Sequence, residues 1–445
     1  MIMIEPVIPP SFVPFLLMFQ ECFGKRTYVN FVSLLVGWIV RLGRRTVTGL
    51  ICAANLEGVK HHTTYHRFFR AAKWVPDQLG NVLLQFILGR PPIDVALRAI
   101  VDDSLTRSVG NEIHSASVHQ DPVRSTKKHK AFHWGHVWVI LAIEVTVPLT
   151  SRRFALPIMA RIYRSEKVCK AQGREFRTKP ELAREMVEEL SAMVPDRAIR
   201  VIGDNAYTNS HLMKDLPENV EFVGHVRMNA VVYGEPDNSK KRPGRRQKKG
   251  KRLPSFDEYA RMRNGWHSAT IKHNNDDIEI KYRVIDGIWY RATGNKRARF
   301  VLVIGWPGAD GPYLLCSTGT ELEATDIILD YAARWGIEVT FHEVKQHLGF
   351  EDPQNRTEVA VERTAPMALW IYSLVVLWFC SLETSAQGAC IPTHAWYKKD
   401  SPAFSDMLAA LRREIWCANI LDPMDLTAKD QINLEPLLRE AAYAT

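Results

Sequence analysis

The stretch VWVILAIEVTV, Val137–Val147, is almost wholly apolar and rich in Val and Ile. This composition predicts a long β-strand. Shorter strands are predicted on either side of it, at Val95–Val101 and at Phe154–Arg161. Three successive strands therefore begin the central part of the chain.

The pattern changes beyond these strands. An amphipathic helix is predicted at Pro180–Met193, where Pro occupies the first turn. Short buried strands follow at Ala198–Ile202 and, after another helix, at Val220–Val226. Three strands, a helix, a strand, a helix and a strand predict a mixed α/β sheet covered by helices.

The N-terminal part is predicted to be helical. Apolar residues recur at helical spacing over Val29–Ile51, and a second helical stretch runs through His62–Ala72. We therefore divide the chain into a helical domain of residues 1–92 and the first part of an α/β core, residues 93–230.

A β-rich insertion, residues 231–324, is predicted to interrupt this core. It opens with Ser239–Arg252 (SKKRPGRRQKKGKR), which has nine Lys or Arg and no acid. The strands predicted after it are Trp266–His273, Ile278–Ile285, Trp289–Arg291, Arg299–Trp306 and Tyr313–Ser317.

Helical periodicity returns at Thr325. Residues 325–385 are assigned to the second part of the core, and residues 386–445 to a helical C-terminal region. The apolar stretch Ala365–Cys380 is shorter than the ~18–20 residues of a bilayer span, so we expect a buried helix.

Composition narrows the class of protein. The chain has 445 residues, 46% hydrophobic and 24% charged, which suits roughly two to four folded domains. Its formal net charge of +9 favours a polyanionic partner, either nucleic acid or an anionic membrane surface. Seven scattered cysteines with no C-x-x-C pair indicate neither a zinc ribbon nor a disulfide framework, and favour a reduced, cytosolic setting. No Lys or Arg precedes Lys25, so a signal peptide is not expected.

Two acidic residues each follow a short, buried-looking strand. They are Asp102, after Ala-Ile-Val, and Asp204, after Val-Ile-Gly. The carboxyl ends of core strands are where an open α/β sheet usually builds its site. A single such Asp is more often a turn or cap residue. Two such residues on separate strands make a shared site more plausible than two unrelated turn residues, but they do not decide between these alternatives.

A third acid lies in the predicted helix Tyr331–Lys345. At ~100° per residue, Tyr331, Arg334, Glu338 and Lys345 project from one stripe roughly 60° wide. Glu343 points about 140° away from Glu338. Spacing alone leaves two readings open, a shared site or a solvated face with an Arg334–Glu338 pair.

The spacing Tyr331, Arg334, Glu338 and Lys345 resembles the YREK signature of one group of DDE insertion-sequence transposases. The flanking Trp335-Gly-Ile-Glu338 and Lys345-Gln-His-Leu-Gly349 are also similar to this family. So are the motifs around the first two acids, Ile100-Val-Asp102-Asp-Ser104 and Val201-Ile-Gly-Asp204-Asn-Ala-Tyr207. The similarity covers roughly residues 30–385.

The resemblance implies a ribonuclease H-like core interrupted by the β-rich insertion, with the N-terminal helical domain binding DNA. Asp102, Asp204 and Glu338 would be catalytic and would hold two Mg²⁺ or Mn²⁺ ions, since these ions take hard oxygen ligands. Asp102 would contact both ions. The enzyme would cleave the inverted ends of its element and join the 3′-OH ends to target DNA.

The resemblance also implies partners. The chain would act on double-stranded DNA as a homodimer on paired ends, with a hairpin intermediate possible and no membrane partner, in the bacterial cytoplasm with the nucleoid. In the family, the Arg and Lys of the signature hold DNA phosphates, which here are Arg334 and Lys345. Tyr331 would bind a phosphate or pack beside it.

Further DNA contacts are expected in the insertion. The basic run is either a solvated loop or a phosphate-binding segment, and we favour phosphate contact. Its candidate residues are Lys240, Lys241, Arg242, Arg245, Arg246, Lys248 and Lys249. Tyr313 occupies the place where the family carries a Trp that stacks on a flipped base. It either stacks in the same way or packs on the sheet.

Two rival functions remain. One is a domesticated, catalytically silent DNA-binding protein, and the other is a ribonuclease H-like repair nuclease. Retention of the three acids with Arg334 and Lys345 argues against the first. The insertion and the YREK stripe argue against the second.

Overall fold

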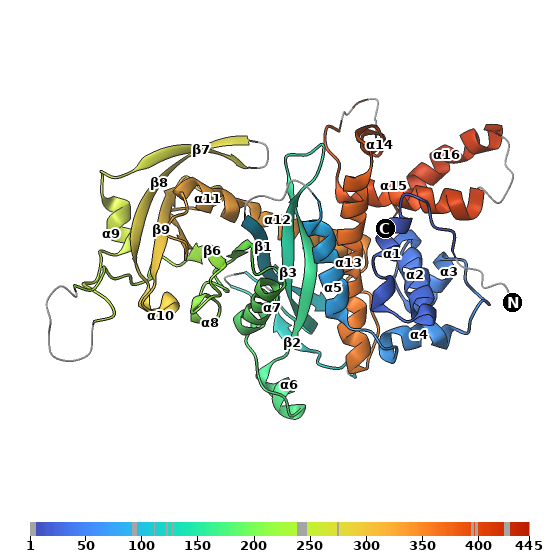
Figure 1. Ribbon diagram of the computed structural model, residues 1–445, viewed down its shortest axis with the longest axis horizontal. Coiled ribbons are helices and arrows are strands. Elements are labelled where there is room, and N and C mark those ends of the chain that lie inside the picture. Colours follow the sequence, from blue (N-terminus) through green and yellow to red (C-terminus); the bar gives the residue numbers. More distant parts are fainter. Residues whose placement is uncertain are drawn as a thin grey trace.

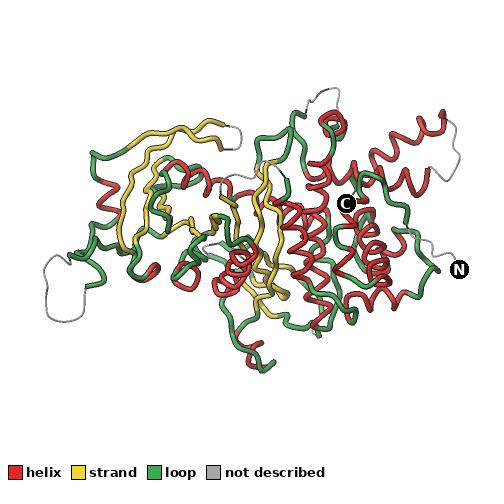
Figure 2. Tube along the Cα trace, in the orientation of Figure 1, coloured by secondary structure: helices red, strands yellow, loops and turns green. Residues whose placement is uncertain are grey.

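The computed structural model describes residues 6–90, 96–110, 112–121, 123–126, 128–237, 247–273, 276–392, 396, 399–421 and 428–444. The predicted boundary at residues 92 and 93 lies outside these ranges, as do Lys240, Lys241, Arg242, Arg245 and Arg246. The ten described strands form one sheet, and most of the helices gather at one end of the molecule (Figures 1 and 2).

The centre of the sheet has five strands. In spatial order they are β4 (Arg153–Tyr163), β3 (Phe132–Thr146), β1 (Ala96–Arg107), β5 (Ala198–Gly203) and β6 (Val220–Val226). Strand β3 is antiparallel to both of its neighbours, β4 and β1, whereas β5 and β6 run parallel to β1. This order and these directions are those of a ribonuclease H-like core, so the predicted fold class is confirmed. A short strand, β2 (Ser117–Gln120), pairs with the start of β3.

Strand β1 is longer than predicted, and this corrects the placement of the first acid. Asp102 does not follow the strand but lies inside it, opposite Ile140 of β3. The apolar run ends at Val101, whereas the hydrogen-bonded pairing with β3 continues to Arg107. Pairing with β5 stops at Val101, so beyond this point β1 is bordered by a strand on one side only.

Helices cover both faces of the core. Helix α7 (Lys179–Met193) packs on β3 and β4 and begins with a capping box between Thr178 and Glu181. Helices α5 (Pro76–Leu88) and α13 (Glu358–Ser381) pack on β4, and Figure 1 shows them on the side of β3 away from α7. The α5–β4 contact requires glycine, because a Cβ at Gly80 would collide with the carbonyl oxygen of Ile158.

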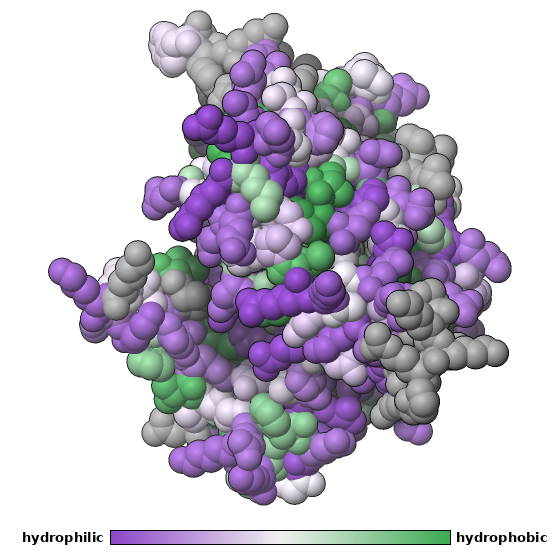
Figure 3. All heavy atoms as spheres, turned by 90° about the vertical axis from the view of Figure 1, so that its left-hand side faces the viewer, coloured by the Kyte–Doolittle hydropathy of each residue, from purple (hydrophilic) through white to green (hydrophobic). Residues whose placement is uncertain are grey.

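The insertion continues the same sheet. Its strands are β7 (His267–His273), β8 (Asp276–Ile288), β9 (Arg297–Ile304) and β10 (Tyr313–Ser317). Strand β10 pairs antiparallel with β6, and β9, β8 and β7 follow outward. The insertion is therefore attached to the core through backbone hydrogen bonds. Its end of the molecule presents a mostly hydrophilic surface with hydrophobic residues in a central hollow (Figure 3).

Two short helices in the insertion were not expected from the sequence. Helix α9 (Phe256–Arg261) begins with a capping box between Ser255 and Glu258. The predicted strand Trp289–Arg291 is wrong, because the helix α10 (Tyr290–Thr293) occupies this place. The aromatic residues favour a strand locally, but the chain must turn here between β8 and β9. It does so with Gly294 at φ 66°.

The N- and C-terminal helices form one bundle beside the core (Figure 1). The predicted helical stretch Val29–Ile51 is divided at residues 41–46 into two helices. The helices of the bundle, besides α5 and α13, are α1 (Val13–Leu17), η1 (Gln20–Cys22), α2 (Lys25–Val40), α3 (Val47–Ala53), α4 (His62–Arg70), α14 (Thr384–Ala389), α15 (Phe404–Trp416), η2 (Cys417–Leu421) and α16 (Ala428–Ala442). Arg412 ties the two ends together, because its guanidinium bonds the carbonyls of Ile39 and Ala442.

The long apolar helix α13 is buried, as predicted. By length and composition alone, Glu358–Ser381 is able to cross a membrane. However, 89% of its apolar window is buried inside the protein. The helix therefore has the environment of a core helix between α5, α4 and β4.

Candidate active site

Strand register brings the first two acids together. The last parallel pair between β1 and β5 is Val101 with Gly203. Asp102 and Asp204 are the next residue on each strand, so they lie at neighbouring register positions where the pairing stops. The negative charge of Asp204 contributes to the raised pKa of Asp102. The structure therefore places the two acids next to each other, and their shared catalytic role stays a prediction.

Asp204 is held in a tight turn after β5. Its Oδ1 atom accepts hydrogen bonds from the backbone N–H groups of Ala206, at 2.8 Å, and Tyr207, at 3.4 Å. The hydroxyl of Thr208 donates to the carbonyl oxygen of Asp204 at 2.8 Å. This turn fixes the carboxylate at the open edge of β1.

The third acid comes from a helix that packs across the core. The predicted single helix is in fact two, α11 (Ala324–Ala333) and α12 (Trp335–His347), which meet at Arg334. Glu338 lies in the first turn of α12. The helix contacts both β4 and β1, so it approaches the strand that carries Asp102.

Arg334 joins the first and third acids. Its Nη1 donates to Asp102 Oδ2 at 2.9 Å, and its Nη2 donates to Glu338 Oε1 at 2.5 Å. The guanidinium also lies over the ring of Tyr331, 5.7 Å from its centre. The predicted Arg334–Glu338 pair exists, but it does not lie on a solvated face, because the Arg334 side chain is largely buried and also bonds Asp102.

Burial dominates the electrostatics of this pair. Burial raises the pKa of Asp102 from 3.8 to about 7, although Arg334 acts in the opposite direction. Asp103 and Asp204 raise it further. For Arg334, burial lowers the pKa, but Asp102, Tyr331 and Glu338 outweigh burial and the pKa lies above its ordinary value. The carboxyl group of Asp102 is thus harder to ionise than that of an exposed aspartate.

The donor set suits a divalent metal ion in its chemistry. Three carboxylates come from three separate elements, and a cationic group already bridges two of them. Hard carboxylate oxygens are the ligands that Mg²⁺ prefers. Within the described residues, however, no group of three or more His, Cys, Asp or Glu side chains is close enough together to hold a metal ion. In this structure Arg334 occupies one oxygen of Asp102 and one of Glu338.

Asp103 faces away from this pair, as its position on the strand predicts. Its Oδ2 accepts a hydrogen bond from Lys179 of α7 at 2.7 Å, and its Oδ1 accepts one from the hydroxyl of Tyr207 at 2.9 Å. Tyr207 is fully buried. The Tyr207 bond ties the turn that carries Asp204 to the strand that carries Asp102. The sequence motif contains Tyr207 but did not reveal this positioning role.

Lys345 also reaches β1. Its ammonium group donates to the carbonyl oxygen of Leu105 at 2.8 Å, three residues beyond Asp102. Burial lowers the pKa of Lys345, and Arg107 lowers it further while Glu351 raises it. Arg334, just before α12, and Lys345, in its last turn, therefore both contact β1, whereas Glu338 is linked to this strand through Arg334. In this structure Lys345 holds the strand, and its contact with a DNA phosphate stays a prediction.

The two tyrosines assigned to DNA contact are partly or wholly inside the protein. Tyr331 is 6% exposed, and its hydroxyl lies 3.1 Å from that of Tyr313. The Tyr313 ring stacks on His225 of β6 with a centroid distance of 4.2 Å, and on Trp306, just after β9, at 5.0 Å. Because β6 and β9 flank β10 on opposite sides, both ring faces are covered. This geometry favours packing for Tyr313 and Tyr331 over direct contact with DNA.

The remaining predicted positions are as follows. Glu343 lies against His347 of its own helix at 3.3 Å, away from Glu338, as the helical wheel predicts. Lys248 is exposed. Lys249 lies over the rings of Tyr233 and Tyr290, 3.9 and 4.9 Å from their centres. The described lysines of the basic run are therefore not equivalent.

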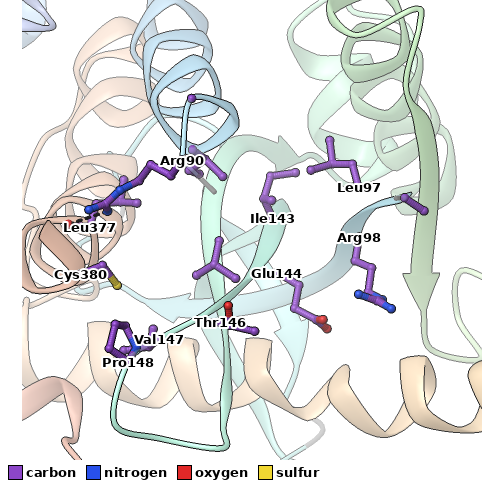
Figure 4. Close-up of a pocket in the computed structure, with 14 residues that line it drawn as sticks. Arg90, Leu97, Arg98, Ile143, Glu144, Thr146, Val147, Pro148, Leu377 and Cys380 are labelled. Atoms are coloured by element: carbon purple, nitrogen blue, oxygen red, sulfur yellow. Dashed lines mark hydrogen bonds between the residues drawn. The ribbon is translucent and has the colours of Figure 1, made fainter. Parts of the chain in front are cut away.

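A cavity of about 560 Å³ lies elsewhere in the core, and none of the three acids lines it. It is situated near the start of β1 and the end of β3, and Arg90, Arg98 and Glu144 lie around it (Figure 4). The acids instead lie at the opposite end of the β1–β5 pairing. This cavity is thus separate from the candidate active site.

Comparison with known proteins gives two similarities. The sequence model of the family described as DDE superfamily endonuclease matches residues 18–279, more than half of the chain. The match includes Asp102 and Asp204 and ends before Glu338. No curated protein matches the sequence. Among solved structures, the chain is similar to a piggyBac transposase in a synaptic complex with hairpin DNA, with 14% identity and a TM-score of 0.42 over 97% of this chain and 80% of that chain.

Proposed function

Because the chain belongs to the DDE superfamily of endonucleases, we propose that it is a DNA transposase that cuts and joins phosphodiester bonds with Asp102, Asp204 and Glu338. The observation that carries the proposal is their arrangement around β1. Asp102 and Asp204 directly follow the last residue pair, Val101 and Gly203, of the parallel β1–β5 pairing, and Arg334 connects Asp102 to Glu338. We assign the protein to the YREK group of insertion-sequence transposases on the spacing from Tyr331 to Lys345.

The three carboxylates would hold two Mg²⁺ or Mn²⁺ ions, with Asp102 between them. When bound, such ions activate the attacking oxygen and stabilise the leaving oxygen of the phosphodiester. Asp102 must lose its proton to act as a ligand, which its pKa of about 7 permits at neutral pH.

The basic residues Arg334 and Lys345 would bind phosphates of the DNA. A guanidinium that leaves Asp102 or Glu338 is able to bind a phosphate through two parallel hydrogen bonds, and Arg334 is placed for this exchange. Lys345 would supply a point charge a few residues further along β1. Tyr207 and Lys179 would keep Asp102 and Asp204 in register through Asp103.

The substrate would be the paired inverted ends of the element, followed by target DNA, bound by a homodimer in the bacterial cytoplasm beside the nucleoid. Residues 1–92 would bind the ends. The net charge of +9 supports a polyanionic partner of this kind.

A cleavage assay on DNA fragments that carry the element's ends tests the proposal. Asp102→Ala, Asp204→Ala and Glu338→Ala should each abolish nicking and leave DNA binding nearly unchanged. Glu343→Ala is the matched control, because it removes a carboxylate from the other face of the same helix. Binding by all proteins with nicking by none, wild type included, would identify a silent DNA-binding protein instead.

A further inference from the structure

A groove of about 420 Å³ lies between the helices α3 and α4 and the segment 353–357, which joins α12 to α13. The residues that line it include four arginines and one histidine and no Asp or Glu. They are Arg45, Arg67, Arg70, Arg356 and His66. Such a one-sided charge in a concave surface concentrates the positive potential and favours an anionic ligand.

Helix α4 has two distinct faces. Its aromatic residues Tyr65, Phe68 and Phe69 are buried in the core, whereas Arg67 and Arg70 are exposed. The guanidinium groups of Arg67 and Arg70 form no ion pair or hydrogen bond with any residue that the structure describes. Two adjacent, unneutralised arginines on a packed helix are therefore available to a ligand.

Arg45, at the inner wall, provides a second and independent observation. The residue is 4% exposed, and its Nη1 and Nη2 bond the carbonyls of Gly43 and His347. Its buried Nε has no acceptor within the described residues. A buried N–H without a partner is costly, and an anionic oxygen in the groove would satisfy it.

The fourth arginine is only weakly neutralised. Arg356 lies 3.3 Å from Glu112, and the two side chains are 72% and 83% exposed. Exposed pairs of this kind contribute ~0–1 kcal/mol and are easily exchanged. Arg356 can therefore exchange Glu112 for a DNA phosphate with little loss of free energy.

The groove is fixed relative to the candidate active site. The C-terminal carbonyls of α12 accept hydrogen bonds from the N-terminal bundle, His347 from Arg45 and Leu348 from Trp38 at 2.7 Å. Glu338 lies nine residues before His347, which is about 14 Å along the helix axis. This distance corresponds to roughly four base pairs of duplex DNA.

We propose that this groove binds the sugar-phosphate backbone of one DNA strand and thereby sets the distance between the bound DNA and Glu338. The inference rests on the proposed function and adds to it the surface that holds the backbone. Arg67, Arg70 and Arg356 bind phosphates from the rim, and Arg45 bonds a phosphate oxygen at the wall. A volume of this size admits a strand backbone while the rest of the duplex stays outside.

The test compares duplex binding by wild type, Arg67→Ala/Arg70→Ala and the control Lys167→Ala/Lys214→Ala in a salt series. The control removes the same charge from two exposed positions outside the groove. We expect the groove variant to lose about tenfold in affinity and its log–log salt slope to fall by about 0.9 for each lost phosphate contact. The control keeps the wild-type slope, and Arg67→Lys/Arg70→Lys restores most of the affinity.

The outcomes test the proposed function and the DNA-binding groove separately. Failure of the wild type to bind any duplex refutes the proposed function and the groove with it. Binding by the wild type with equal slopes in groove and control variants refutes the groove alone. A loss confined to element-end DNA, with none on scrambled duplex of equal length, would mean that the arginines read bases, which overturns the backbone assignment. Matching unfolding midpoints of all variants exclude misfolding.

Discussion

Arg334 donates a 2.9 Å hydrogen bond to Asp102, although 232 residues separate them in the chain. The bond crosses from the junction of α11 and α12 to the middle of β1. It places a permanent cation against an acid that burial makes reluctant to ionise. The same guanidinium holds Glu338, so a single side chain organises two of the three acids.

Replacement of Arg334 by Gln should destabilise the protein and reduce nicking by at least about a hundredfold. The variant leaves two partly buried carboxylates without their cation, and loss of one partner of such a pair costs about 3 kcal/mol. Urea unfolding with and without Mg²⁺ measures the effect. The added ion should recover part of the loss, because it can replace the guanidinium between the carboxylates. Arg291→Gln, at an exposed position, is the control. If the unfolding curves of Arg334→Gln coincide with those of the control, the contacts of Arg334 with Asp102 and Glu338 contribute nothing to stability.

The ionisation of Asp102 should make both stability and metal binding depend on pH. Its pKa in the folded protein is about 7, above the ordinary value of 3.8. A raised pKa adds stability below pH 4, and this contribution is lost as the pH rises through 7. Between about pH 4 and pH 7, the free energy of unfolding of the wild type should therefore fall by up to about 1.4 kcal/mol per pH unit relative to that of Asp102→Asn.

Mg²⁺ or Mn²⁺ should raise the unfolding midpoint at pH 8 but much less at pH 5.5, because the ion must displace the proton of Asp102. Asp102→Asn should lose the shift at pH 8. Ca²⁺ should support DNA binding without efficient cleavage, since it takes looser, higher-coordinate geometry. Efficient cutting in excess EDTA contradicts the metal requirement.

Two lysines of the basic run, Lys248 and Lys249, should behave differently. Lys248 is exposed, so Lys248→Ala should reduce the salt slope of DNA binding by about 0.9. Lys249 is engaged with Tyr233 and Tyr290, so Lys249→Ala should mainly affect the stability of the insertion. Anisotropy titrations and thermal unfolding of each variant separate the effects. Equal salt slopes for Lys248→Ala and wild type would show that Lys248 is an ordinary solvated residue without a phosphate contact.

Tyr313 should act through packing. Tyr313→Ala removes the ring between His225 and Trp306 and leaves Tyr331 without its hydroxyl partner, which should destabilise the protein by about 3 kcal/mol. Tyr313→Phe should cost only about 1 kcal/mol. A 2-aminopurine base near the tip of the DNA end distinguishes the rival role. If Tyr313 stacks on a flipped base, the base brightens with wild type and less with a folded Ala variant.

Local pattern was sufficient to predict most of the helices and strands. Strands such as Val220–Val226 and Tyr313–Ser317 have the predicted bounds, because runs of apolar and β-branched residues reflect burial directly. Short motifs also indicated Asp102, Asp204 and Glu338 as candidate catalytic residues, and this role stays a prediction. The strand at Trp289–Arg291 failed because the turn between β8 and β9 overrides local preference.

The sequence by itself determined which segments become strands and helices and which carboxylates are candidates, since both depend on residues a few positions apart. Only the tertiary structure decided that β1 runs on past Asp102, that Arg334 bridges two acids and that His225 and Trp306 enclose Tyr313. These contacts join residues far apart in the chain. They arise from strand register and helix packing, which place side chains together in ways that no local spacing encodes.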